Sequence, residues 1–488
     1  MPSQQPHVLL VSFPLQGHVN PLLRLGARLA ARDLLVTFTT FRHAGLRALP
    51  DDGACVGAGA GRGRLRFEYL RRRDAPDDPR RYQDPTDMLR HVADAGPSAL
   101  ACLIRRQAGA GRPVACVVNN PFVPWALDVT SGMGIPCAML WIQSCAVLSL
   151  YYHFYSFPEA FPSDADPDAP VAVPGLPTVA ADELPHMVRP EYARNLWGDM
   201  LRAQLGGIGK KTVSWVLVNT FYGLERSAID ALRSHVPVTP VGPLLEHDDR
   251  RDGDGDDDDL AAVADDDGCV AWLDAQPPRS VVYVAFGSLV NIGRGEMLAV
   301  AEGLVGTGRP FLWVVRDDSR ELLPEDALAA ISGKGKVVAW CPQGRVLGHD
   351  AVGCFVTHCG WNSVAEALAA GVPMVGYPWW SDQFTNAKML VDEYKVGVQL
   401  PAPVTRDALR ACVDEVMSGP EAAAFRMRAT AWKEEATASV ADGGSSDRNL
   451  QAFVEDIRRS HGKGSRGGSR ISSSGNIAKH LNSIDVIP

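Results

Sequence analysis

The sequence predicts an α/β fold built from two parallel β-sheets. Short apolar runs alternate with helix-length segments twice along the chain of 488 residues. Near-continuous apolar strands that alternate with helices are typical of parallel sheets covered by helices on both faces. A charge-dense segment, poor in helix-forming patterns, separates the two series. These observations predict two Rossmann-like domains joined by an exposed linker.

The first series of strands occupies residues 1–240, which we assign to an N-terminal domain. In the helix expected after the first strand, Pro21 suits the first turn, and Leu22, Leu25 and Leu29 form an apolar stripe. The expected strands of this domain are His7–Phe13, Leu34–Thr40, Val114–Asn120, Ile135–Trp141 and Trp215–Phe221.

Residues 133–152 are apolar enough to suggest a membrane span as an alternative. Pro136, Gln143 and Ser144 interrupt this stretch, and a strand-like half precedes a helix-like half. We therefore expect a buried strand followed by a buried helix.

Residues 241–278 are expected to form an exposed linker between the domains. The runs DDRRDGDGDDDD and ADDDG are dense in charge and cannot bury apolar surface. An acidic cluster can also suggest a divalent-cation site, but such a site needs positioned oxygen ligands. No flanking strand or apolar frame would position them here, so we expect a solvated linker and no metal.

The second series of strands occupies residues 279–446, the expected C-terminal domain. A helix is expected at 447–460, and the Gly/Ser-rich residues 461–488 are expected to be disordered. The expected strands are Ser280–Ser288, Pro310–Arg316, Lys336–Trp340, Gly353–Gly360 and Pro373–Pro378.

Composition limits the class of protein. The formal net charge of −9 argues against a nucleic-acid partner. The ten cysteines form no CxxC pair, so free thiols in a reducing compartment explain them most simply. The N-terminal residues do not form a signal-peptide pattern. We expect a cytoplasmic monomer that binds neither nucleic acid nor a membrane.

The segment from Trp340 to Gln383 carries the clearest functional pattern. An apolar run ends at His358, the tight turn CGWN follows, and a strongly helical segment begins at Ser363. The first turn of a helix has unpaired N–H groups and about half a positive charge, so it can bind a diphosphate. His358, Asn362 and Ser363 add side-chain donors there. Glu366 could accept hydrogen bonds from ribose hydroxyls.

This segment resembles, over its whole length, the C-terminal signature of the plant family-1 UDP-sugar glycosyltransferases. The resemblance implies the GT-B architecture, in which two Rossmann-like domains face each other across a cleft and the helix at 447–460 returns to the N-terminal domain. It also implies that Trp340 stacks on uracil, that Glu366 binds ribose, and that Asp382 and Gln383 bind the sugar. The final Gln favours UDP-glucose, which is a donor substrate, and no cofactor is expected. The implied donor-site residues are Ser288, Trp340, Cys341, Gln343, His358, Trp361, Asn362, Ser363, Glu366, Trp380, Asp382 and Gln383.

The acceptor side is expected to depend on His18, in the motif FPLQGHVNP. This histidine follows the first strand, at the edge where open α/β sheets bind ligands. The motif around it, with Gly17, Asn20 and Pro21, resembles the family motif that contains the catalytic base. We therefore expect His18 to lie at the reacting hydroxyl or carboxyl group of the acceptor.

Asn120 marks a difference from the commonest family pattern, in which an Asp pairs with the catalytic His. An Asn contributes no charge to stabilise an imidazolium, so His18 should be a weaker base. A phenol, with a pKa of about 10, would need that base, whereas a carboxylic acid, with a pKa of about 4, is already ionised. Asn120 therefore favours a carboxylate acceptor. Asp128, about two helical turns further on, is an alternative partner for His18.

Three further segments, NNPFVPWALDV, LWIQSCAVLSLYYHFY and VNTFYGLE, resemble the subgroup that makes 1-O-glucose esters of plant acids. The resulting hypothesis is inverting transfer of glucose from UDP-glucose to a hydroxycinnamic, benzoic or auxin-like acid. Transfer to phenol or alcohol hydroxyls of flavonoids or hormones is the alternative, and a non-catalytic binding protein is a third. The acceptor pocket is expected to include residues 154–188, whose sequence has no pattern that names the acceptor.

Overall fold

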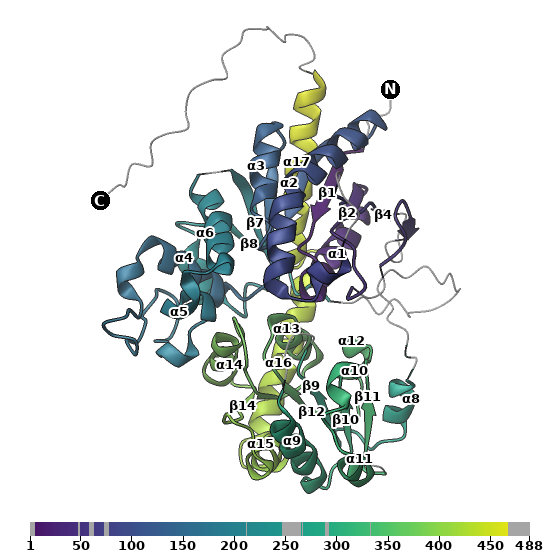
Figure 1. The fold of residues 1–488 in the computed structure, drawn as a ribbon, viewed down its shortest axis with the longest axis vertical. Helices are drawn as coiled ribbons and strands as arrows, with labels where there is room; N and C mark the ends of the chain where they lie inside the picture. Colours follow the sequence, from purple (N-terminus) through teal and green to yellow (C-terminus); the bar gives the residue numbers. More distant parts are fainter. Residues whose placement is uncertain are drawn as a thin grey trace.

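The chain folds into two α/β lobes, each built around one sheet (Figure 1). This computed structural model describes residues 5–46, 49–57, 63–72, 78–210, 212–245, 265, 267–287, 292–331 and 333–466. In Figure 1 the N-terminal lobe lies above the C-terminal lobe, and α17 (Ser445–Arg466) runs up into the N-terminal lobe. The two lobes confirm the expected fold class.

The N-terminal sheet has eight strands among the described residues, in the order β3-β4-β2-β1-β5-β6-β7-β8. Its neighbouring strands are parallel except for the edge pair β3 and β4, which is antiparallel. Only residues 58–63 separate these two strands, which is too short for the crossover that a parallel pair needs. The strands are β1 (His7–Val11), β2 (Leu35–Thr39), β3 (Cys55–Gly57), β4 (Arg64–Phe67), β5 (Val114–Asn119), β6 (Cys137–Trp141), β7 (Val213–Val218) and β8 (Val238–Pro240).

Side chains of β1 show how this sheet is buried on both faces. Val8 and Leu10 pack in one core cluster and Leu9 and Val11 in the other, as the two-residue period of a strand requires. Helices α1 and α17 cover the first face, and α2 covers the second. The helices of this domain are α1 (Gln16–Ala30), α2 (Pro85–Gly109), α3 (Trp125–Gly132), α4 (Cys145–Ser156), α5 (Pro190–Ala193), α6 (Leu196–Gly209) and α7 (Arg226–Leu232).

The C-terminal sheet is parallel throughout, and its six strands in the described regions follow the order β11-β10-β9-β12-β13-β14. Helix α13 packs on one face, and α9 and α15 pack on the other. The strands are β9 (Val281–Ala285), β10 (Phe311–Val314), β11 (Gly335–Val338), β12 (Val352–Thr357), β13 (Met374–Gly376) and β14 (Gly397–Gln399). The helices are α8 (Cys269–Asp274), α9 (Arg294–Gly306), α10 (Asp317–Arg320), α11 (Glu325–Ile331), α12 (Gln343–Leu347), α13 (Trp361–Ala370), α14 (Gln383–Asp392), α15 (Arg406–Ser418) and α16 (Ala422–Val440).

Two segment assignments differ from the expectation. The expected linker at 241–278 ends in α8, whose Cys269 and Leu273 are fully buried in the C-terminal core because they lie one helical turn apart on its apolar side. Residues 461–466, expected to be disordered, continue α17, since extending an existing helix is much easier than starting one. The charge-dense run at 248–259 and the tail from 467 lie outside the described residues, whereas Asp265 of the second run accepts from the main-chain N–H groups of Cys269 and Val270 at the start of α8.

The apolar stretch at 133–152 forms β6 and the first part of α4, both buried in the N-terminal domain. The membrane-span alternative is therefore wrong for this stretch. In the described ranges, no helix combines the length and the apolar character that crossing a bilayer requires.

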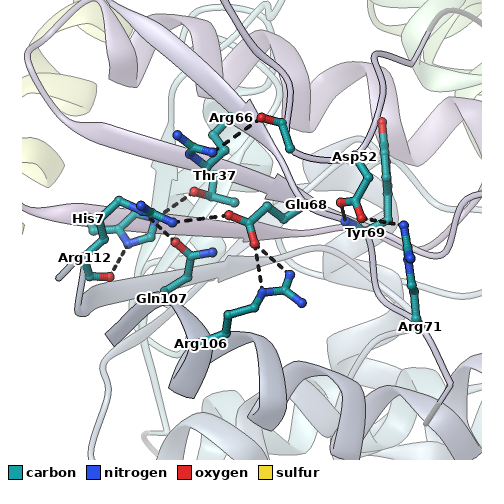
Figure 2. A network of polar contacts seen from close by, with 11 residues as sticks. His7, Thr37, Asp52, Arg66, Glu68, Tyr69, Arg71, Arg106, Gln107 and Arg112 are labelled. Carbon is teal, nitrogen blue, oxygen red and sulfur yellow. Dashed lines mark hydrogen bonds and ion pairs between the residues drawn. The ribbon is translucent and has the colours of Figure 1, made fainter. Parts of the chain in front are cut away.

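A buried polar network holds the beginning of β1 (Figure 2). His7 is 1% exposed, its Nδ1 lies 2.8 Å from the main-chain oxygen of Arg112, and its Nε2 lies 2.9 Å from Oγ1 of Thr37. Glu68 accepts from Arg106 at 2.7 Å in the same network. Burial lowers the pKa of His7 to about 4, and the hydrogen bond to Arg112 offsets only part of this effect.

We expect His7→Gln to weaken the dependence of stability on pH. The folded pKa of about 4 lies below the unfolded value of about 6.5, so the unfolded chain binds more protons between these values. Stability contributed by neutral His7 is therefore lost as pH falls from about 6.5 towards 4. The decrease in Tm between pH 7 and pH 5 should be smaller in His7→Gln than in the unmodified protein. An equal decrease would show that folding does not lower the pKa of His7.

Candidate active site

The predicted site residues come together where the carboxyl ends of both sheets meet. His18 lies in the first turn of α1, after β1, and Asn120 directly follows β5. From the other domain, Gln343 follows β11 and His358 follows β12. Open parallel sheets bind ligands at this edge, because the loops after the strands converge there.

The turn between β12 and α13 carries the residues expected to bind the diphosphate. Cys359 has a left-handed backbone (φ 63°), which reverses the chain before Gly360 begins the helix cap. No side chain caps α13, so its first N–H groups are left to a ligand. Nδ2 of Asn362 donates to the main-chain oxygen of Gly17 across the cleft at 2.9 Å, and its Oδ1 is buried without a partner among the described residues.

His358 is held by close contact with two glycines. A Cβ on Gly287 would lie 2.7 Å from the imidazole ring, and one on Gly360 would lie 2.4 Å from Nε2, so only glycine fits at either position. Burial lowers the pKa of His358 to about 4, which makes the ring neutral near pH 7. Its Nδ1 is buried and has no hydrogen-bond partner in the described part of the chain.

Gln343, expected at the donor site, joins several of the other expected donor-site residues. Its Nε2 donates to Oγ of Ser363 (3.1 Å) and to Oε2 of Glu366 (2.6 Å), while its Oε1 accepts from the hydroxyl of Tyr283 (3.1 Å). Cys341 lies beneath this group, with its Sγ 3.3 Å from the same hydroxyl. Burial raises the pKa of Cys341 to about 12, so this thiol is a neutral packing group. Trp340 is partly buried.

Glu366 also has a partner that the sequence did not indicate. Its Oε1 accepts from Nη1 of Arg24 at 2.8 Å, and Arg24 belongs to α1 of the N-terminal domain. The carboxylate expected to bind ribose is therefore held from both sides of the cleft.

Asp382, one of the residues expected to bind the sugar, is held by Asn386, which is fully buried. Its Nδ2 donates to Oδ2 of Asp382 (2.7 Å) and to the main-chain oxygen of Cys359 (3.0 Å). Its Oδ1 accepts from Oγ of Ser144, the N-cap of α4, at 2.9 Å. Burial raises the pKa of Asp382, and the hydrogen bond from Asn386 offsets part of that effect.

Gln383 is oriented by the main chain before it. Its Oε1 accepts from the N–H groups of Trp379 (2.8 Å) and Trp380 (2.9 Å), which leaves its Nε2 group to donate elsewhere. The Trp380 ring packs against His186, 4.7 Å between centroids. This aromatic contact joins the N-terminal domain to the end of the donor segment.

For two expected donor-site residues, the structure does not show a position in the donor site. Trp361 is 3% exposed, and its Nε1 donates to the main-chain oxygen of Asn219 in the N-terminal domain at 2.7 Å. Its side chain therefore forms an interdomain contact. Ser288 lies outside the described residues.

Asn120 organises the loop that carries His18. Its Oδ1 accepts from the N–H of Phe13 (3.0 Å), and its Nδ2 donates to Oγ of Ser12 (3.1 Å) and to the main-chain oxygen of His18 (3.0 Å). The alternative partner Asp128 is exposed on α3, and in the described regions Nδ1 of His18 has no hydrogen-bond partner. The Asp128 alternative is therefore wrong, because an exposed carboxylate on α3 cannot serve a buried ring nitrogen.

Burial lowers the pKa of His18 to about 4, and the nearby Asn120 side chain offsets only part of the effect. The imidazole lies among aromatic rings: its centroid is 5.4 Å from Phe13 and 5.8 Å from Phe122. Trp197 completes the group, 5.0 Å from Phe122. Phe122 has a left-handed backbone (φ 70°), which is strained in a bulky residue and is found mostly at functional sites. This aromatic group suits a flat, partly apolar acceptor.

Sequence reasoning missed Arg24, Asn386 and the aromatic group around His18. Asn386 lies four residues after Asp382, and side chains at this spacing meet on a helix, so that pair was readable. The contacts of Arg24 and Trp197 join segments far apart in the chain, and no spacing indicates them.

We expect Gly287→Ala to impair catalysis more than folding. The added methyl group would push the His358 ring from its position, so kcat/KM should fall by roughly 10- to 100-fold, as for displaced groups that stabilise a transition state. Gly308→Ala is the matched control, because Gly308 also has a positive φ but has no atom within 4 Å of an added Cβ. Both variants lose Tm to the same kind of backbone strain, and Gly287→Ala should lose somewhat more because of its clash, so kcat/KM is compared at a temperature where both are folded. Equal kinetic constants for the two would contradict the role given to His358.

Comparison with known proteins agrees with this geometry. Residues 254–431 match the family UDPGT, described as UDP-glucoronosyl and UDP-glucosyl transferase. A gallate 1-beta-glucosyltransferase of Punica granatum is 42% identical over 470 residues, which cover 93% of this chain and 91% of the relative. A cinnamate beta-D-glucosyltransferase of Fragaria ananassa is 42% identical over 467 residues, covering 93% and 83%.

Among solved structures, Os79 from O. sativa in complex with UDP superposes with a TM-score of 0.80 at 31% identity, covering 92% of this chain and all of that one. The similarity to these proteins extends along nearly the whole chain. It includes the fold with two sheets and the donor segment. The chain therefore belongs to the plant family-1 UDP-glycosyltransferases, with the GT-B fold.

Proposed function

We propose that this enzyme transfers glucose from UDP-glucose to the carboxylate of a small aromatic acid and forms a β-glucose ester. The observation that carries the proposal is the state of His18, which is neutral, has no acidic partner in the described chain and lies among aromatic rings. Relatives named for gallate and cinnamate, at 42% identity, support the same class of acceptor.

The donor is bound by the C-terminal side of the cleft. Trp340 stacks on uracil, Glu366 accepts from the ribose hydroxyls, and Asp382 and Gln383 hold the glucose hydroxyls. His358, Asn362 and the N–H groups at the start of α13 bind the diphosphate. Neutral His358 acts there as a hydrogen-bond donor and not as a fixed cation, since its pKa is about 4.

The transfer needs no proton to be removed from the acceptor. One carboxylate oxygen attacks C1 of glucose on the face opposite the diphosphate, and a new C1–O bond forms as the bond from C1 to the diphosphate oxygen breaks. The electron pair of the broken bond goes to UDP, whose charge is stabilised by the donors around α13. Attack from the opposite face converts the α-linked donor into a β-linked ester.

His18 has a positioning and hydrogen-bonding role for an acid acceptor. A carboxylic acid with a pKa of about 4 is ionised near pH 7 without a base. A neutral imidazole can donate one N–H to such a carboxylate in the apolar setting of Phe13 and Phe122. The second candidate is a phenol acceptor, favoured by the unpartnered Nδ1 of His18, which could accept a proton.

The cysteines support action in a reducing compartment. All ten are free thiols, and burial keeps the pKa of those in the cores well above the usual value, as for Cys116 and Cys354. Such thiols are poor nucleophiles and stay reduced in the cytosol. We propose a cytoplasmic enzyme that acts as a monomer.

The first experiment measures UDP release from UDP-glucose with cinnamic acid and with a phenol of similar shape, followed by mild alkali on each product. We expect turnover of the acid and a product that alkali cleaves, because an ester is labile where a phenolic glucoside is not. Turnover of the phenol alone, with an alkali-stable product, would overturn the ester assignment and leave the donor site in place.

A second experiment tests the role of His18 and Asn120. His18→Ala should lower kcat with the phenol by roughly 100-fold or more and with cinnamic acid much less, because only the phenol needs a base. Asn120→Asp should raise the ratio of phenol to acid turnover, since an added carboxylate raises the pKa of the imidazole.

Asn119→Asp is the matched control for that change. Asn119 is also fully buried, but its Nδ2 donates to the main-chain oxygen of Val123, away from His18. This variant should keep the acceptor ratio of the unmodified enzyme. An unchanged ratio in Asn120→Asp as well would contradict the argument that Asn120 selects acids.

A further inference from the structure

Arginines recur at four-residue intervals along α1 and just past its end, with Arg24 and Arg28 in the helix and Arg32 two residues after it; we call these three the arginine stripe. Residues at this spacing project on the same side of a helix. Arg28 donates to two main-chain oxygens of residues 241–243 (3.2 and 3.0 Å), and Arg32 pairs with Asp447 of α17. The stripe therefore fastens α1 to the chain that leaves the N-terminal domain and to the helix that returns to it.

Arg24, at the cleft end of the stripe, reaches the donor site. Its Nη1 lies 2.8 Å from Oε1 of Glu366 and 3.1 Å from the main-chain oxygen of Leu244. The side chains of Arg24 and Glu366 are only 11% and 9% exposed. An ion pair withdrawn from water is strongly coupled, because removal of either partner leaves a buried charge without compensation.

The two oxygens of Glu366 are held by different domains. Arg24 of α1 binds Oε1, and Gln343 of α12 binds Oε2. A carboxylate oxygen can accept more than one hydrogen bond. These two contacts therefore fix the plane of the carboxylate, and each oxygen can still accept from a ligand hydroxyl. If Glu366 binds ribose, its geometry is complete only when α1 lies against the C-terminal domain.

We propose that Arg24 is a positioning residue for the donor: it aligns Glu366 with the ribose hydroxyls and makes tight nucleotide binding depend on contact between the two domains. The inference rests on the proposed donor site and adds a residue of the acceptor domain to it. Contact between domains and nucleotide binding must then favour each other to the same extent, because the coupling is reciprocal.

A ribose contact is distant from the breaking bond, so it contributes about equally to the ground state and the transition state. Loss of Arg24 should therefore weaken donor binding more than it slows the chemical step. Arg24→Gln should raise the Kd of UDP and the KM of UDP-glucose roughly 10- to 100-fold, the usual cost of losing a charged hydrogen bond, with a smaller change in kcat.

The test compares the Kd of UDP with that of 2′,3′-dideoxy-UDP by calorimetry. The unmodified enzyme should bind UDP more tightly, because Glu366 accepts from the two hydroxyls. In Arg24→Gln this preference should largely disappear, and in Arg24→Lys it should be partly restored, because a Lys keeps the charge. Adding Arg24→Gln to Glu366→Gln should change the preference little further, since both act on one contact.

Arg32→Gln is the control in the same arginine stripe, two residues past the end of α1. It removes the ion pair with Asp447, which lies in α17, and touches no donor-site residue. The variant should keep the UDP preference of the unmodified enzyme, even where its Tm falls. This comparison separates alignment of Glu366 from general support of α1.

The outcomes distinguish this inference from the function on which it rests. A full preference for UDP retained in Arg24→Gln would overturn the positioning role and leave the donor site intact. No preference in the unmodified enzyme would overturn the ribose role of Glu366 and, with it, that of Arg24. Ester formation from cinnamic acid is measured separately and does not depend on either result.

Discussion

The hydrogen bonds of Asn386 join the parts on which this active site depends. This one buried side chain contacts the turn before α13, the carboxylate of Asp382 and the cap of α4 in the other domain. Neither domain alone contains a complete site, because each supplies one wall of the cleft. A rigid link between the walls is therefore a condition of catalysis, since a displacement of about 1 Å can cost a large factor in rate.

The electrostatic character of the cleft follows from the burial of its ionisable side chains. Burial keeps His18 and His358 neutral near pH 7, with pKa values of about 4, and it raises the pKa of Asp382. Around the diphosphate the site therefore offers oriented hydrogen bonds and the dipole of α13 in place of imidazolium cations. Such groups stabilise the charge that develops on the departing diphosphate without binding the intact donor too tightly.

On the acceptor side, the hydrogen bonds of a buried amide likewise fix the position of a functional side chain. Asn120 forms hydrogen bonds with the main chain around His18, including the N–H of Phe13. It therefore shapes the loop that holds the imidazole. An aspartate at 120 would place a carboxylate oxygen against the carbonyl of His18, where Asn donates. The amide thus fits this loop, and the weak base that results suits an acceptor that is already ionised.

The sequence by itself determined the fold class and the segment to which we assign the donor site. Buried parallel strands such as Val352–Thr357 must be apolar throughout, and a phosphate-binding turn needs its glycine and its donors close together in the chain, so both leave a local pattern. The position of His18 after the first strand was readable for the same reason.

Only the tertiary structure decided the contacts that cross between domains. The pairing of Arg24 with Glu366, the direction of Trp361 towards Asn219 and the packing of Trp197 beside Phe122 join residues far apart in the sequence. Such contacts depend on how two folded surfaces meet, which no local spacing records. The sequence therefore showed which side chains have suitable chemistry. The packing of the two domains against each other decided which partners those side chains contact.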